Sequence, residues 1–248
     1  MRFDRGLRVW RSKDHVQRNA RRLARVARWN RPIANRTERV LAWVNMLFAD
    51  HGVFRLVYLN RHRVGAGRLW RSAQPAPHQI DRFARAGIRS VVCLRGQPEY
   101  GSWPLEHERC EALGLDFRDV TVRSRAAPER ETILALKDMF ETISYPALIH
   151  CKSGADRAGL AAALYLIFQE GVAPERAMRQ LSLRYGHVRQ AKTGILGRFF
   201  AAYLAEAARA PIGFEDWVRT RYDPAALEAS MTRRRGFDLF VDRVLRRE

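Results

Sequence analysis

The middle of the chain alternates between short apolar runs and longer segments with apolar residues at helical spacing. The short runs lie at residues 67–75, 88–96, 115–122 and 146–151, and their length and composition are typical of buried strands. The longer segments lie at residues 77–87, 104–114 and 127–143, with a fourth that ends at Gly171. Because strands that alternate with helices pair in parallel, this order predicts an α/β fold with a mostly parallel central sheet and flanking helices.

The two ends of the chain have a different pattern. Beyond Pro174 the apolar spacing becomes helical, at residues 174–186, 193–209, 214–222 and 223–231, and the final segment 232–248 is basic and amphipathic. Residues 14–29 also place apolar side chains at helical spacing beside arginines. We therefore divide the chain into a basic N-terminal extension (1–39), a central α/β domain (40–210) and a helical basic C-terminal tail (211–248).

The formal net charge of +19 is the most informative feature of the composition, because it bears on the partners of the protein. Residues 1–39 alone carry thirteen arginines and lysines against three acidic residues. This excess favours anionic partners, such as phosphorylated molecules, acidic lipid surfaces or nucleic acid, without choosing among them. For residues 14–29 two interpretations stay open, a solvated charged face that packs on the main domain or a helix that lies on an anionic bilayer. Their composition also resembles an organelle transit peptide.

The sequence contains no clear targeting signal or membrane-spanning segment. The most apolar stretch, residues 40–60, is interrupted by Asp50, His51 and Arg55, so we expect no transmembrane helix. The first residues lack the apolar core of a secretory leader, and three cysteines do not form a disulfide framework. We expect a cytoplasmic protein, with peripheral attachment to the inner face of the membrane as a further option for the basic segments.

One short segment carries candidate chemistry. Residues 150–157 read His-Cys-Lys-Ser-Gly-Ala-Asp-Arg, between a buried strand and an alanine-rich helix. Such a turn directs backbone N–H groups inward as an anion nest, and the helix N-terminus points at the same place. Gly154 allows the curvature, and Arg157 offers a planar fork to two phosphate oxygens. These positive groups favour the thiolate of Cys151. The competing interpretation is a buried structural cysteine.

With this loop, the chain resembles the cysteine-dependent phosphatases, in particular compact bacterial members of the dual-specificity branch of the protein tyrosine phosphatase superfamily. The resemblance rests on the sequence of residues 69–96 and on Leu-Ile-His-Cys-Lys-Ser-Gly-Ala-Asp-Arg-Ala-Gly at 148–159, within roughly residues 64–171. It implies that Cys151 is the nucleophile that forms a phosphocysteine and that Arg157 clamps the phosphate. It also implies that His150 tunes the thiolate. Lys152, Ser153, Gly154 and Ala155 would complete the substrate-binding loop, and no metal or cofactor is implied.

The chain departs from the family pattern at two catalytic positions. The family usually has Ser or Thr after the loop arginine, where this chain has Ala158. Because that hydroxyl helps the cysteine leave, we expect slow breakdown of the intermediate unless Ser153 substitutes. The family also has an Asp on a loop about thirty residues before the cysteine, and the corresponding segment 122–131 has none.

Several carboxylates remain as candidates for the general acid. Asp156 is our preferred candidate, since similar loops of myotubularin-like lipid phosphatases use an Asp there. Asp119 is the second candidate, although it lies in a predicted strand. Glu129 and Glu131 open a predicted helix, where acidic residues are common for electrostatic reasons alone. A third option is that no dedicated acid exists.

The substrate is less well defined than the reaction. No phosphotyrosine-recognition loop is found, and Lys152 is similar to a cation of phosphoinositide phosphatases, although the second lysine of those enzymes is Ala155 here. We expect hydrolysis of phosphate monoesters of a phosphoprotein or phospholipid type. The alternative is a catalytically weak phosphate-binding pseudo-phosphatase module, which Ala158 and the missing loop Asp favour. We do not expect nucleic-acid binding, which would rest on charge alone without a recognisable motif.

A few residues outside the loop have two interpretations each. Arg71 and Gln74 follow a predicted strand and either border the site or fix a turn. The basic stretch 182–194 is either an ordinary loop or a wall of the active-site mouth. Cys93 and Cys110 are expected to be small buried hydrophobic residues rather than thiols that react with Cys151.

Overall fold

The computed structural model describes residues 16–17, 19–96 and 98–231. The predicted amphipathic segment at 232–248 and the first fifteen residues lie outside the described residues. A five-stranded sheet has the order β1-β2-β5-β3-β4, and only β1 and β2 pair antiparallel. The strands are β1 (His62–Val64), β2 (Leu69–Ala73), β3 (Ser90–Cys93), β4 (Asp116–Asp119) and β5 (Ala147–Cys151). The predicted mostly parallel α/β fold is therefore confirmed.

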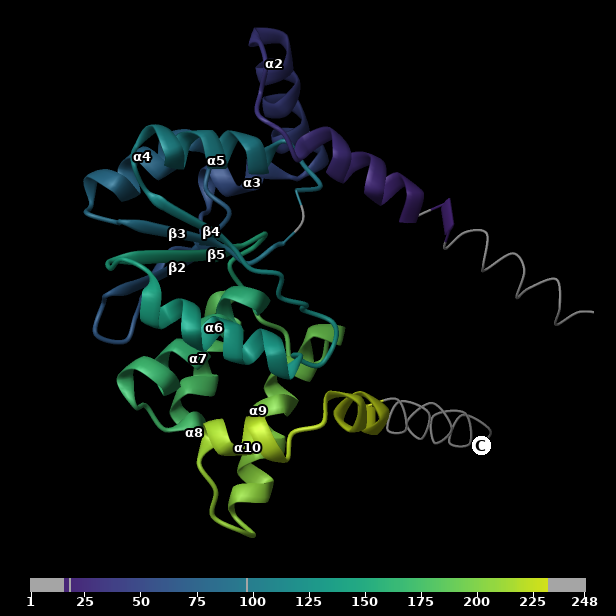
Figure 1. The fold of residues 1–248 in the computed structure, drawn as a ribbon, viewed down its shortest axis with the longest axis vertical. Helices are drawn as coiled ribbons and strands as arrows, with labels where there is room; N and C mark the ends of the chain where they lie inside the picture. The colour runs from purple at the N-terminus through teal and green to yellow at the C-terminus, as the bar shows by residue number, and fades with distance from the viewer. Residues whose placement is uncertain (1–15, 18, 97, 232–248) are drawn as a thin grey trace, which may run out of the picture.

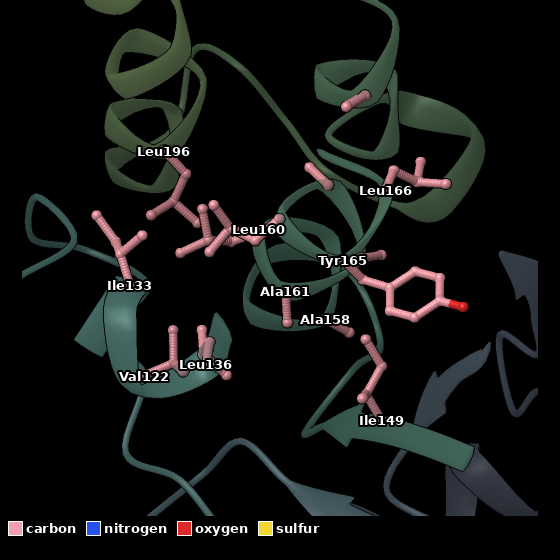
Figure 2. Close-up of a cluster of buried hydrophobic side chains, with 14 of the residues drawn as sticks. Val122, Ile133, Leu136, Ile149, Ala158, Leu160, Ala161, Tyr165, Leu166 and Leu196 are labelled. Atoms are coloured by element: carbon pink, nitrogen blue, oxygen red, sulfur yellow. The ribbon is translucent and has the colours of Figure 1, made fainter. Parts of the chain in front are cut away.

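Helices cover both faces of the sheet (Figure 1). On one face lie α4 (Pro77–Arg85) and α5 (Ser102–Ala112), with α3 (Gly52–Val57) beside them, and on the other lie α6 (Arg130–Thr142) and α7 (Asp156–Glu170). Beyond α7 follow α8 (Pro174–Ala177), α9 (Ile195–Ala207) and α10 (Phe214–Thr220). Side chains of β5, α6, α7 and α9 meet in the larger core (Figure 2). The predicted helices at 77–87, 104–114 and 127–143 and the one that ends at Gly171 are thus present, with small shifts at their ends.

Strand β5 lies in the middle of the sheet, between β2 and β3. All five of its residues are buried, because helices cover both faces of a strand in this position. Its carboxyl end, at Cys151, is level with the ends of β3 and β4: Cys93 pairs with both His150 and Asp119. The fold therefore brings the loop after β5 to the edge of the sheet where parallel strands present their functional residues.

Two segments differ from the sequence-based expectation. The predicted helix at 174–186 is only the short α8, followed by 3₁₀ turns at Met178–Gln180 and Leu183–Tyr185; Gly186, with a φ of 80°, ends the second turn. Residues 36–57, to which we assigned no element, form α2 (Arg36–Val44), a π-helical turn (Asn45–Ala49) and α3. The side chain of Asn35 caps α2 by accepting a hydrogen bond from the Glu38 amide at 2.9 Å.

The N-terminal basic segment contains a helix at residues 19–29. Arg22 and Arg25 each contact Glu99 at 2.9 Å, and the buried Trp29 packs in a small core beneath α2. Val16 and Leu23 are exposed, so of the large apolar side chains of this segment it is Trp29, at its end, that packs on the described part of the main domain. The division at residues 39 and 210 stays a prediction. Within the described ranges, no helix is long and apolar enough to cross a membrane.

Candidate active site

The loop after β5 is tightly curved. Cys151 ends the strand and is only 2% exposed, and α7 begins five residues later at Asp156. Gly154 has a φ of +74°, and a Cβ at this position would lie 2.7 Å from the backbone nitrogen of Ala73. Position 154 therefore requires glycine for two reasons. Its backbone is left-handed, and β2 leaves no room for a side chain.

The amide groups of this loop are available to a ligand. Within the described ranges, no backbone or side-chain acceptor takes the amides of residues 153–158, and no side chain caps the start of α7. Free N–H groups in a turn and at a helix N-terminus together create a positive potential that suits a tetrahedral anion. The loop can thus bind a phosphate group above Cys151.

Arg71 supports the loop from the opposite side. Its fully buried guanidinium donates through Nη2 to the carbonyl oxygens of Gly154 at 2.7 Å and Ala155 at 2.9 Å. Through Nη1 it donates to the backbone and the side chain of Gln180, at 2.8 Å each. Burial lowers the pKa of Arg71 to about 10, against the raising effect of the negative charge of Cys151. The guanidinium therefore remains charged at neutral pH.

A second side chain fixes the outer part of the loop. Asn60 donates through Nδ2 to the carbonyl oxygens of Ser153, at 3.0 Å, and Tyr185, at 2.9 Å. The Tyr185 ring stacks on the Arg71 guanidinium, with 4.2 Å between the guanidinium carbon and the ring centroid. With their carbonyl oxygens held from outside, the loop residues keep their amides free for an anion.

Two cations of the loop differ in their surroundings. Arg157 is half-buried and has no hydrogen bond or ion pair with any residue that the structure describes. The Nζ atom of Lys152 lies 3.4 Å from Asp50, a fully buried carboxylate that also contacts Arg55, Arg95 and Ser102. Burial alone would raise the pKa of Asp50, but its bonds with these arginines outweigh that effect and lower the pKa to about 2. Of these two cations, Lys152 contacts a carboxylate of the protein, whereas Arg157 is free to bind a ligand.

His150 lies behind the loop in a buried polar contact. Its Nε2 atom is 2.7 Å from Oε1 of Glu106, and both side chains are fully buried. Gln74 donates to the second oxygen of Glu106 at 2.7 Å and also contacts Arg95. Neither Nε2 of His150 nor Oε1 of Glu106 makes a hydrogen bond with a described residue, so the carboxylate restricts the imidazole ring next to the cysteine by close contact.

Cys93, Glu106 and His150 are the only group of potential metal ligands among the described residues. Their ligand atoms lie within 4.8 Å of one another, but Glu106 and His150 already contact each other. Burial strongly raises the pKa of the Cys93 thiol and, in the same way, that of Cys110. Both side chains are fully buried, which confirms the expectation of small buried residues and does not favour thiolate ligation.

The two candidate aspartates differ in position: Asp156 is the first residue of α7, directly after the loop, whereas Asp119 ends β4, which β3 separates from β5. The Oδ1 atom of Asp156 lies 2.7 Å from Nδ1 of the fully buried His187. Asp119 accepts a hydrogen bond from Nε1 of Trp103 at 2.5 Å. Partial burial of its carboxyl group raises the pKa of Asp119, although the residue as a whole is exposed. Glu129 and Glu131 lie at the start of α6, as expected.

A groove of about 740 Å³ opens beside the loop. One wall is α3 and the residues that flank it, and the other includes Lys152, Ser153 and Asp156. Tyr185 and Gly186 also line it, so the basic stretch 182–194 contributes to a wall of the site. Ala158 is fully buried in the first turn of α7, beneath the loop rather than in the groove.

Several supporting residues were missed from the sequence. Arg71 was expected to border the site or fix a turn, whereas it holds the loop. No role was predicted for Asn60 or Glu106, His187 was considered only as part of the basic stretch 182–194, and Asp50 was noted only as an interruption of an apolar run. A charged residue inside an apolar strand, such as Arg71, signals a buried partner, but the sequence does not show which carbonyl groups it meets.

Comparisons with known proteins indicate the family of the chain. A family model described as Swiss Army Knife protein, DSP-PTPase phosphatase domain, matches residues 63–193, just over half of the chain. The sequence matches no curated protein.

The structure is similar to several solved structures at low sequence identity. TpbA from P. aeruginosa is 20% identical, with 70% of this chain and 91% of that one covered and a TM-score of 0.46. PTPMT1 is 19% identical, with 60% and 99% covered and a TM-score of 0.45. Tk-PTP in its active form is 22% identical, with 58% and 93% covered and a TM-score of 0.45. On the strength of the family match, the chain belongs to the DSP-PTPase phosphatase domain family of the Swiss Army Knife proteins and is a cysteine-dependent phosphatase.

Proposed function

We propose that the protein hydrolyses phosphate monoesters in two steps through a phosphocysteine. The Cys151 thiolate attacks phosphorus and forms an S–P bond, while the P–O bond to the leaving group breaks and that oxygen takes a proton from an acid. Water then cleaves the S–P bond, which releases inorganic phosphate and restores the thiolate. The observation that carries this proposal is the set of free amides in the loop that directly follows Cys151, together with an Arg157 that has no partner, all within the part of the chain that the structure describes.

The loop residues have distinct roles in this proposal. The amides of Ser153, Gly154 and Ala155 and the fork of Arg157 hold the equatorial oxygens, where negative charge gathers in the transition state. Lys152 adds positive charge at the mouth, and His150, in contact with Glu106, orients the loop from behind. Arg71 is a positioning residue, since it touches the loop carbonyls and not the substrate.

Asp156 remains our proposed general acid, with Asp119 as its rival. Asp156 lines the groove into which the leaving group would extend, and His187 fixes its orientation. Asp119 has the raised pKa that suits a proton donor. We further propose that no hydroxyl replaces the one missing at Ala158, because the carbonyl of Ser153 is bound to Asn60 and its side chain is exposed.

Turnover of a simple aryl phosphate tests the proposal against the alternative of a pseudo-phosphatase. We expect the wild type to release phosphate and Cys151→Ser to abolish release while it still binds inorganic phosphate. Arg157→Lys keeps the charge but removes the fork, and should raise KM and lower kcat. A wild type that binds phosphate without any Cys151-dependent turnover would establish the binding module instead.

A further inference from the structure

The groove beside the catalytic loop has an apolar wall that projects into solvent. Phe54 is 71% exposed and Val57 is 92% exposed on α3, and Val53 and Tyr58 extend the same wall. The volume of about 740 Å³ is in the range of sites that hold small organic ligands. A phosphate in the loop would thus have a large apolar surface next to its ester group.

On the α3 side of the groove, the polar side chains of Arg55 and Asn60 are already bonded within the protein. Arg55 contacts Asp50, and Asn60 donates to two carbonyl oxygens and accepts from Tyr58 and His62. A bound peptide would bring backbone donors and acceptors that need partners. A hydrocarbon chain brings none, and so this side of the groove fits a hydrocarbon better than a peptide.

The neighbouring helix is apolar on two faces. In α2 and the π-helical turn after it, Ala42 and Met46 face the small core. Four apolar residues on the outer side are exposed: Val40, Leu41, Val44 and Phe48. Within the described ranges nothing covers this outer face, and Arg25 and Arg28 line a second groove of about 430 Å³ against it. Apolar side chains flanked by arginines are typical of a helix that lies at the surface of an anionic bilayer.

The exposed apolar side chains are confined to this region of the molecule. Among the described residues, every large hydrophobic side chain that is exposed lies between Val16 and Tyr58, apart from Leu183 and Val188. Those two belong to the stretch 182–194, which borders the catalytic groove. Scattered exposure needs no explanation, but exposed apolar side chains that line a groove beside a phosphate site mark an interaction surface.

We propose that the substrate is a lipid phosphate monoester presented by an anionic bilayer. Its phosphate binds in the Cys151 loop, its acyl part lies along Phe54 and Val57, and the outer face of α2 contacts the bilayer. This inference rests on the proposed function and adds the substrate class to it. The excess of positive charge supplies the attraction to the anionic surface.

The experiment compares substrates that share one headgroup and differ in acyl length. The full-length protein is assayed with long-chain phosphatidic acid in phosphatidylcholine vesicles, with water-soluble short-chain phosphatidic acid, and with the corresponding long- and short-chain phosphatidylinositol phosphates. A phosphotyrosine peptide and an aryl phosphate complete the set. We expect kcat/KM for at least one long-chain lipid to exceed that for its short-chain analogue about tenfold or more.

Variants at the groove test the role of its apolar wall. Phe54→Ser combined with Val57→Ser should lower the long-chain to short-chain ratio about tenfold, whereas Phe54→Leu combined with Val57→Leu, which stays apolar, should retain it. Thermal unfolding and molar mass in solution are measured for each variant. A ratio that survives in the folded serine variant overturns the proposal, as does preference for the phosphopeptide. Loss of a dimer without loss of lipid preference would assign the surface to a second copy of this chain.

Failure of this inference differs from failure of the proposed function. Cys151-dependent hydrolysis of the aryl phosphate, without any effect of acyl length, rejects the lipid substrate alone. An absence of turnover on every substrate rejects the proposed function and this inference with it.

Discussion

The Nη2 atom of Arg71 lies 2.7 Å from the carbonyl oxygen of Gly154, so strand β2 and the loop after β5 are joined by a buried, charged hydrogen bond. Hydrogen bonds to charged donors are among the stronger ones in proteins. The bond holds the carbonyl group outward, so that the amides face the opposite side. The geometry of the anion nest therefore depends on Arg71, which contacts the loop and, in the proposed mechanism, does not contact the substrate.

We expect Arg71→Met to reduce the free energy of unfolding by about 2–4 kcal/mol, because several buried carbonyl groups lose their donor. The kcat for aryl phosphate should fall by about tenfold or more. Arg71→Lys, which keeps the charge but has fewer donors, should be intermediate. Thermal unfolding and steady-state kinetics measure the two effects, and a fully active Arg71→Met protein would contradict the assigned role.

Gly154→Ala should reduce kcat about hundredfold, because a methyl group there meets the backbone of β2 and forces the loop away. The matched control is Gly114→Ala, at a similarly left-handed glycine with a φ of +64° and nothing within 4 Å of the added Cβ. The control carries the backbone strain without the clash, so it should lose stability but little activity. Equal losses of activity in the two variants would refute this explanation.

Asp156→Asn should lower hydrolysis of an alkyl phosphate about hundredfold, and lower hydrolysis of an aryl phosphate with a good leaving group much less. Asp119→Asn is the matched comparison. A general acid must carry its proton, so the rate declines as the pH rises through its pKa. If Asp119→Asn shows the larger loss, the acid is Asp119, and the raised pKa of its carboxyl places this decline above the usual range for Asp.

Ala158→Ser should speed the second step by restoring a hydroxyl in the first turn of α7. Stopped-flow assays with the wild type should show a burst of the aryl product followed by a slower steady rate, and the variant should show a smaller burst with a higher kcat. Because the position is buried, the added hydroxyl should also lower the free energy of unfolding by about 1 kcal/mol. A wild type without a burst would mean that the second step is already fast.

The buried Asp50 should make the fold sensitive to acid. The pKa of its carboxyl is about 2 in the folded protein, against 3.8 for an unperturbed aspartate, so its ionised form stabilises the fold above pH 3.8, and that stabilisation is lost as the pH falls towards 2. The loss amounts to about 2 kcal/mol. Denaturant unfolding at a series of pH values should show this decline in the wild type and a smaller one in Asp50→Asn.

The parts of the fold that could be predicted are those whose signals are local. The apolar run of β5, the glycine of the loop and the following helix are all encoded within residues 146–171, so the position of Cys151 at a sheet edge followed directly. Helix α2 was missed because it runs into the almost unbroken apolar stretch 40–49, which does not indicate where a helix begins or ends. The contraction of 174–186 into short turns depends on packing against α7, which the local pattern does not contain.

The candidate site likewise combines residues that could be predicted from local sequence with residues that could not. The loop residues are adjacent in sequence, whereas its supports come from far along the chain: Asn60 is 93 residues from Ser153, and Arg71 is 83 residues from Gly154. Contacts of this length depend on strand order. The pairing of β2 with β5 was not predicted, and so the partner of Arg71 was not either.

Helix α7 carries a run of fully buried small residues, among them Ala158, Gly159, Ala161 and Ala162. At Gly159 an added Cβ would lie 2.8 Å from Leu181 and 3.3 Å from Nη2 of Arg71. These residues let the helix sit close to its neighbours, and a rigid helix transmits any displacement to its first turn. A larger side chain at these positions would therefore disturb the packing of the core and the position of the catalytic loop together, because both depend on the same small residues.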